Sequence, residues 1–166
     1  MPEKRTIDRA RRDRRQGKAA STQAGEFVRE EMHHIREGKH GARSAKQAVA
    51  IGLSKARRAG VELKPPAKGK TSERTRKSAE RAYELGHGAR PRRASTAKRR
   101  RAAATALERE GRRSASRTAL SRQARSAAGR RSAAGRSASA RRAARTKGPA
   151  RRHAAARKAA RTRARA

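Results

Sequence analysis

SAKQAVAIGLSKARRAG, residues 44–60, carries the strongest helix signal in the chain. Ser44, with Gln47 three residues later, forms a capping box that can satisfy free backbone N–H groups at the start of a helix. Gly60 can take the left-handed conformation that ends a helix, and Val61 beyond it can pack back on Ala56. The sequence therefore predicts a helix over residues 45–59. Its apolar face consists of Ala45, Ala48, Val49, Gly52, Leu53 and Ala56.

A second helix is predicted upstream, over about residues 22–37, where four apolar residues recur at helical spacing. Gly38 and Gly41 follow and interrupt the pattern. The small residues of the helix over 45–59 allow the helix over 22–37 to approach closely, so we expect a helical hairpin within residues 20–62. Its core is very small and comprises Phe27, Val28, Met32, Ile35, Val49, Ile51 and Leu53.

The predicted hairpin has too little core to be firmly stable alone. Ile51 also lies off the apolar stripe, which leaves apolar surface uncovered. We therefore expect a homodimer that forms through the N-terminal helices.

Three weaker segments flank the hairpin. Residues 1–19 form a basic N-terminal arm with only Ile7 and Ala10 to bury, so we expect a solvated or partner-induced helix there. Residues 63–71 are rich in proline, glycine and lysine and are predicted to be an extended linker. Residues 72–86 are predicted to form a weak helix with a thin apolar side.

The remaining residues, 87–166, form a low-complexity basic tail that contains 27 Lys and Arg but only two acidic residues. Leu107 and Leu120 are its only large apolar residues, and the hexamer RSAAGR occurs twice in tandem over residues 125–136. Like charges at neighbouring positions repel, and no core can form, so we expect the tail to be disordered. The predicted fold class is a mainly disordered chain with a small all-α N-terminal helical hairpin and a long, low-complexity basic tail.

The composition of the whole chain argues against an enzyme. The 166 residues carry a formal net charge of +37, and only 1% of them are aromatic. So few large apolar side chains cannot build a core of ordinary size to support a rigid active site. The absence of cysteine excludes disulfides, thiolate zinc sites and thiol catalysis. We therefore expect no catalytic residue and no cofactor.

A group of histidines and glutamates near the end of the second helix contains metal-ligand side chains. Metalloproteases place two histidines four residues apart with a glutamate beside the first, and that order is absent here. The pattern favours a solvated helix face, and we expect no metal site. The residues concerned are Glu30, Glu31, His33, His34, Glu37 and His40.

No segment of the chain predicts insertion into a membrane. The first five residues are not followed by the apolar region of a signal peptide. The longest run of small or apolar residues, 48–53, is far too short to span a bilayer. We expect a soluble, cytoplasmic protein without a membrane partner.

The basic residues instead predict binding to a polyanion. Residues 111–166 contain no Asp or Glu, whereas an ordinary solvated surface mixes both signs of charge. Each phosphate neutralised by Lys or Arg releases condensed counterions, which drives binding to nucleic acid irrespective of its base sequence. Arginine also bonds phosphate oxygens bidentately. The predicted nucleic-acid-binding residues are Lys55, Arg57 and Arg58 in the hairpin, and Arg90, Arg92, Arg93, Lys98, Arg99, Arg100, Arg101, Arg112, Arg113, Arg130, Arg131, Arg141, Arg142, Arg151 and Arg152 in the tail.

DNA is favoured over RNA as the partner. Single-stranded RNA is usually read by stacking its bases on aromatic side chains, and the chain has only Phe27 and Tyr83. The alternative of an RNA-binding or ribosome-associated basic protein stays open, because an arginine-rich tail can also thread into folded RNA. Sequence-specific reading of DNA by the helix over residues 45–59 would require a firmly held hairpin.

Residues 46–60, KQAVAIGLSKARRAG, together with residues 27–32 and 37–39, carry a family resemblance. They resemble the unit of helix, glycine-rich turn and helix in small, basic, uncharacterised bacterial proteins. This resemblance covers about residues 20–62 and implies no established activity. In composition only, the tail resembles bacterial linker-histone-like proteins, whose tails are richer in Lys and Pro. We therefore expect a histone-like, nucleoid-associated protein that binds and condenses DNA without sequence preference.

Overall fold

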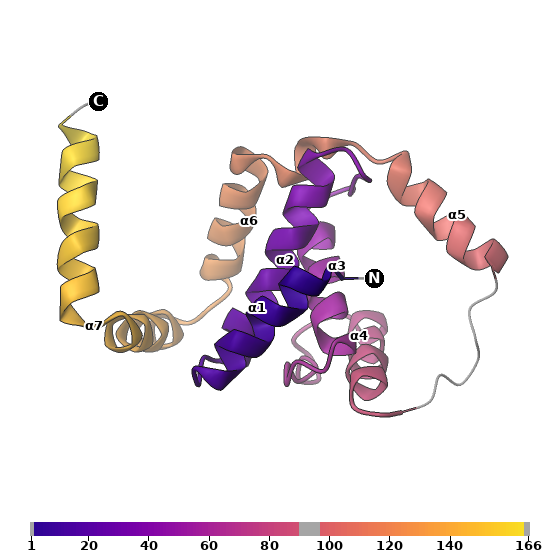
Figure 1. The fold of residues 1–166 in the computed structure, drawn as a ribbon, viewed down its shortest axis with the longest axis horizontal. Coiled ribbons are helices and arrows are strands. Elements are labelled where there is room, and N and C mark those ends of the chain that lie inside the picture. Colours follow the sequence, from indigo (N-terminus) through magenta and orange to yellow (C-terminus); the bar gives the residue numbers. More distant parts are fainter. Residues whose placement is uncertain (1, 90–96, 165–166) are drawn as a thin grey trace. The chain divides into compact units, whose positions relative to one another are not determined.

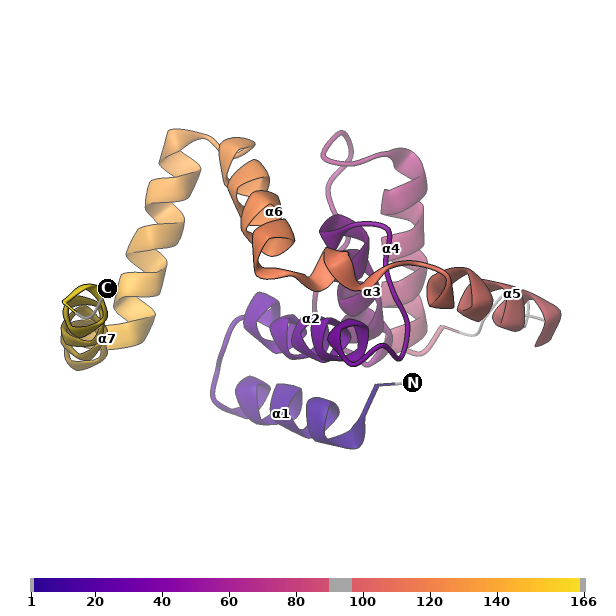
Figure 2. The same cartoon turned by 90° about the horizontal axis from the view of Figure 1, so that it is seen from above.

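The first four helices of the chain pack in sequential order (Figures 1 and 2). The structure is a computed structural model that describes residues 2–89 and 97–164. The second helix contacts both the first and the third, and the third also contacts the fourth. Their bounds are Lys4–Arg15 for α1, Ala20–Arg36 for α2, Ala45–Arg58 for α3 and Glu73–Gly86 for α4. All four belong to one unit, residues 1–123, and residues 124–166 form a second unit.

The part of residues 87–166 that the structure describes is also largely helical, so the predicted disorder of the tail is wrong. The described chain is all-α rather than mainly disordered. Alanine and arginine are among the strongest helix formers, and repulsion between like charges costs only about 0.2–0.5 kcal/mol per neighbouring pair. The helix preference of alanine and arginine therefore outweighs the repulsion between neighbouring arginines in this segment. The helices are α5 (Ala97–Glu108), the 3-10 helix η1 (Arg112–Ala115), α6 (Arg117–Gly129) and α7 (Ala133–Arg163).

The helix predicted over residues 45–59 is confirmed to within one residue by α3. Ser44 Oγ accepts a hydrogen bond from the backbone N–H of Gln47 at 3.2 Å. At the other end, Gly60 has a φ of 81°, and the N–H of Val61 donates to the carbonyl of Ala56 at 3.1 Å. The glycine stop is as the sequence predicts, whereas only the Ser44 half of the capping box forms, because Gln47 Oε1 accepts from the N–H of Arg43 at 2.9 Å and not from that of Ser44.

Close contact between α2 and α3 depends on the lack of a side chain at Gly52. A Cβ at this position would lie 2.7 Å from Val28 Cα, well inside van der Waals contact. The two helices therefore pack directly against each other, as the predicted hairpin requires.

Two apolar clusters form the core of the first unit. One surrounds Phe27, which is 1% exposed, and the other surrounds Ile35, which is fully buried. Both clusters include residues from outside the predicted hairpin, so the core is larger than the sequence analysis expected. The buried members are Ala10, Ala24, Phe27, Ala56 and Val61 in the first cluster, and Met32, Ile35, Ala42, Ala48 and Ala115 in the second.

The N-terminal arm is part of this core, contrary to the expectation of a solvated helix. Thr6 and Ala10 of α1 are buried. Arg9 Nε lies 2.7 Å from a carboxylate oxygen of Glu26 in α2, and this ion pair is largely shielded from solvent. Small side chains let α1 approach α2 closely, so a helix with few large apolar residues can still be held.

Residues 107–120 also belong to the first unit and pack on α2 and α3, although no core contacts were expected there. Ala115 is fully buried in the second cluster, and its carbonyl accepts a hydrogen bond from Arg36 Nε at 3.1 Å. Gly41 makes room for this segment, because a Cβ at that position would lie 1.7 Å from the carbonyl oxygen of Glu110. Close backbone approach, the small side chain of Ala115 and the partly buried Leu120 therefore hold this segment on the second cluster.

Helix α7 consists of two helical segments that meet at Gly148, where φ is 67° and ψ is 169°. Pro149 follows the kink and suits the first position of a helix, because the N–H that proline lacks would have no helical partner there. Ser132 caps the first segment by accepting a hydrogen bond from the N–H of Gly135 at 3.1 Å. Across the described ranges no helix, α7 included, is long and apolar enough to cross a membrane.

Candidate nucleic-acid interface

The structure places most of the predicted nucleic-acid-binding side chains on the surface. Arg90, Arg92 and Arg93 lie outside the described residues. The exposed residues of the predicted set are Arg58, Lys98, Arg99, Arg100, Arg101, Arg112, Arg113, Arg130, Arg131, Arg141, Arg142, Arg151 and Arg152.

Two residues of the predicted set are engaged inside the first unit. Arg57 is 7% exposed, and its Nε donates a hydrogen bond to the carbonyl of Leu63 at 2.9 Å. Burial lowers the pKa of the Arg57 guanidinium from its ordinary value. Lys55 Nζ lies 2.6 Å from Glu31 Oε2, and this carboxylate is fully buried. We therefore leave Lys55 and Arg57 out of the candidate interface.

The second unit carries positive charge without acidic side chains. Residues 124–166 contain 15 of the 50 Lys and Arg and none of the 13 Asp and Glu. Every arginine that the structure describes in this unit is exposed. The first unit holds all the acidic residues, and several of these pair with its basic side chains, as Glu73 and Glu80 do with Arg76. The second unit therefore has no carboxylate that competes with phosphate for its arginines.

The kink in α7 forms a cleft of about 470 Å³ that is bordered by arginines. Arg141 and Arg145 lie one turn apart on the same face of the first segment. Arg152 approaches from the second segment, and its Nε donates to the carbonyl of Gly148 at 3.4 Å. Three guanidinium groups around one concavity repel each other unless an anion lies among them, and phosphate matches their hydrogen-bonding geometry. The lining residues are Arg141, Ala144, Arg145, Gly148, Pro149 and Arg152.

A second cleft, of about 400 Å³, lies at the start of α6 within the first unit. Arg36, Arg112 and Arg117 line it together with Ala115 and Ser116. Ser116 Oγ accepts a hydrogen bond from the N–H of Ala119 at 3.2 Å, so the positive end of the α6 dipole is directed here as well. This cleft has the same chemistry as the cleft in α7.

Neither aromatic side chain of the protein is available as a platform for bases. Phe27 is 1% exposed in the core. The Tyr83 ring stacks on His87 with 4.0 Å between ring centroids, and its hydroxyl donates to Glu62 Oε2 at 2.7 Å. The hydrogen bond to Glu62 raises the pKa of Tyr83. The interface therefore offers charge and hydrogen-bond donors for phosphate but no stacking surface.

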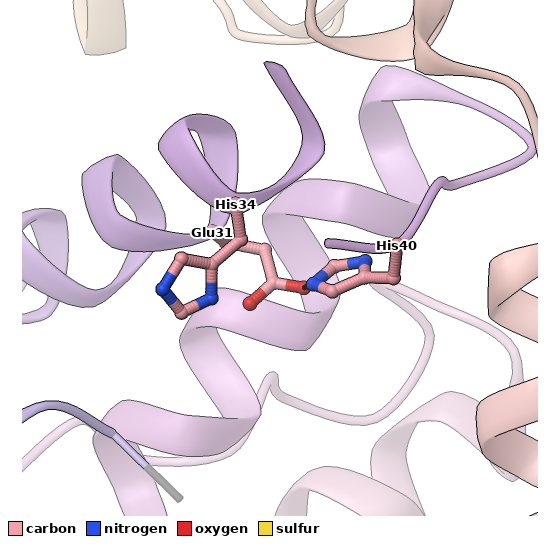
Figure 3. A group of neighbouring side chains, drawn as sticks. All are labelled: Glu31, His34 and His40. Carbon is pink, nitrogen blue, oxygen red and sulfur yellow. Dashed lines mark ion pairs between the residues drawn. The ribbon is translucent and has the colours of Figure 1, made fainter. Parts of the chain in front are cut away.

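Part of the group of histidines and glutamates is buried, which corrects its interpretation as a solvated helix face. Figure 3 shows the carboxylate of Glu31 between the rings of His34 and His40. Side-chain exposure is 0% for Glu31, 13% for His34 and 17% for His40. His40 follows the end of α2 in sequence, but the turn through Gly38 brings its ring back to that helix. Of the other members, His33 and Glu37 are exposed.

The comparisons with known proteins provide no assignment for this interface. No protein-family model, curated protein or solved structure matches the chain. The geometry and the charge of the described residues are therefore the basis for inferring a function.

Proposed function

We propose that this protein binds DNA without sequence preference and condenses it, as a histone-like, nucleoid-associated protein of the cytoplasm. The observation that supports the proposal is the second unit, in which 15 basic residues occur without one acidic residue and every described arginine is exposed. Contacts between such a surface and phosphates release counterions and need no particular base sequence.

The length of the α7 segments agrees with the charge spacing of duplex DNA. The segment over residues 149–163 is about 22 Å long at 1.5 Å per residue. Over that length a duplex presents about 13 phosphate charges, of which about half face one side. Six basic residues lie on the segment, and at helical spacing four of them share one side that can face these phosphates, namely Arg151, Arg157, Lys158 and Arg161.

Two features favour DNA over single-stranded RNA and support condensation. Phe27 is buried and the Tyr83 ring is stacked on His87, so the chain offers little aromatic surface to bases. Each unit also has its own arginine-lined cleft. One chain can therefore hold phosphates of two duplex segments, which is the requirement for condensation.

The proposal is tested by binding of the full-length protein to two duplexes of scrambled, unrelated sequence over a range of salt concentrations. We expect equal affinities and a slope of log K against log salt on the order of −9, for about ten phosphate contacts. A shallow slope, or a strong preference for one duplex, contradicts non-specific binding. A folded RNA of the same length serves as a third ligand, and tighter binding to it favours the RNA-binding alternative.

A further inference from the structure

Glu31, His34 and His40 have the side-chain composition of a metal centre. One potential ligand atom from each residue lies within 4.8 Å of the other two. Tetrahedral zinc with bonds of about 2.0–2.1 Å holds its ligand atoms about 3.3 Å apart. His40 Nε2 and Glu31 Oε1 are already 3.2 Å apart. Two of the three ligands thus stand at the spacing that a tetrahedral ion requires, and the ligand atom of His34 lies within 4.8 Å of both.

The second nitrogen of each imidazole is held by an acceptor. His40 Nδ1 lies 3.1 Å from the carbonyl oxygen of Gly41, which can only accept, so this nitrogen carries a proton. His34 Nε2 lies 3.0 Å from Glu3 Oε1. A carboxylate oxygen accepts, so in this pair Nε2 is the donor. In the neutral imidazoles these bonds leave lone pairs on Nδ1 of His34 and Nε2 of His40, the arrangement that orients metal-binding histidines.

The buried carboxylate of Glu31 lacks hydrogen bonds of its own. Neither of its oxygens has a hydrogen-bond partner of acceptable geometry. Lys55 Nζ compensates the charge near Oε2 at 2.6 Å, whereas Oε1 lies 3.2 Å from His40 Nε2. A carboxylate oxygen and an imidazole nitrogen at this separation need a proton or a metal ion between them.

Acidic side chains gather around the three residues in a chain that is otherwise strongly positive. Four of the 13 acidic residues lie here, namely Glu3, Glu30, Glu31 and Glu37. The cations that pair with them are Arg5, Lys39 and Lys55. Glu30 and Glu31 are both buried and share the single ammonium group of Lys55.

We propose that Glu31, His34 and His40 bind one divalent transition-metal ion, with Zn²⁺ as the best match. Imidazole nitrogen suits zinc and its neighbours in the series, whereas magnesium and calcium prefer oxygen ligands. The ion links α2 to the turn that carries His40 and, through Glu3 and His34, to the start of α1. Its role is structural, because it holds together a unit whose apolar core is small.

The test is a titration of the full-length protein with ZnCl₂, monitored by calorimetry, and with CoCl₂, monitored by visible absorption. We expect one equivalent to bind, with a weakening of at least tenfold in His34→Ala and in His40→Ala. His33→Ala is the matched control, because His33 is an exposed neighbour on the same helix, and it should bind as the unaltered protein does. At a free Zn²⁺ concentration 100 times the dissociation constant, the unfolding equilibrium constant should fall about 100-fold.

Histidine NMR signals of the unaltered protein keep the test decisive if the alanine variants do not fold. The signals of His34 and His40 should shift together at one equivalent of Zn²⁺, while those of His33, His87 and His153 stay in place. Failure of the unaltered protein to bind Zn²⁺ or Co²⁺ overturns the proposal, and Glu31 and His40 are then a buried ion pair. A shift of the exposed histidines, or loss of binding in the His33 variant, overturns it as well.

Discussion

Replacing the three arginines of the α7 cleft should weaken DNA binding by an amount that the counterion argument specifies. The triple variant is Arg141→Gln, Arg145→Gln and Arg152→Gln. If each guanidinium contacts one phosphate, its loss removes about 0.9 from the slope of log K against log salt. Three losses reduce the slope by about 2.7, which corresponds to an affinity about 500-fold lower at 0.1 M salt if these contacts contribute nothing at 1 M.

The matched control changes the net charge equally but in the first unit. Arg12→Gln, Arg15→Gln and Arg81→Gln alter exposed side chains of α1 and α4, which lie among acidic residues. Glutamine has nearly the helix preference of arginine, so circular dichroism of both variants should match that of the unaltered protein. The assay is fluorescence anisotropy of a labelled duplex at five salt concentrations. An unchanged slope in the cleft variant, or an equal loss in the control, refutes the placement of the interface in the second unit.

Three further predictions concern the fold of the first unit. Gly52→Ala places a Cβ against Val28 and should lower the free energy of unfolding, measured in urea, by about 1–3 kcal/mol. Gly25→Ala, on the open side of α2, should raise the free energy of unfolding by about 0.5–1 kcal/mol. Equal effects of the two variants would contradict the close packing of α2 and α3. The Tyr83 carbonyl and Glu62 raise the pKa of His87, so its contribution to stability is complete below the ordinary value of 6.5 and is lost as the pH rises through the raised value. The free energy of unfolding of the unaltered protein should therefore decline above pH 6.5, and that of His87→Gln should not. An equally steep decline in the variant would count against the pairing of His87 with Glu62. Gly41→Ala would overlap the backbone at Glu110 and should expose the adjacent arginines to trypsin; an unchanged cleavage rate would show that residues 107–120 are not held as described.

The helices of the N-terminal half could be predicted from the sequence because their signals are local. Ser44 with Gln47 and the glycine stop at Gly60 act within a few residues of the helix ends, and the structure shows both. The small side chain of Gly52 likewise indicates a close contact between helices, although not with which residue. Such signals define where α3 begins and ends without knowledge of the rest of the chain.

The packing of residues 107–120 could not be predicted because large apolar residues were taken as the requirement for a core. Ala42, Ala48 and Ala115 pack together instead, and small residues of this kind carry almost no periodic signal in a sequence rich in alanine. The proximity of His40 to Glu31 has a similar origin, since it depends on how the turn after α2 folds back. Small residues with a nearby glycine, such as Gly41, are the sequence feature that could have indicated this segment.

We propose that the exposed arginines bind DNA regardless of its sequence, and crosslinking in cells is the most stringent check of this binding. DNA and RNA recovered with the crosslinked full-length protein are both sequenced, with the Arg141, Arg145 and Arg152 triple variant as the control. We predict DNA fragments spread over the chromosome without a shared motif, and a much smaller yield from the variant. Recovery of mainly RNA, or of DNA from a few sites with a common sequence, would contradict the claim.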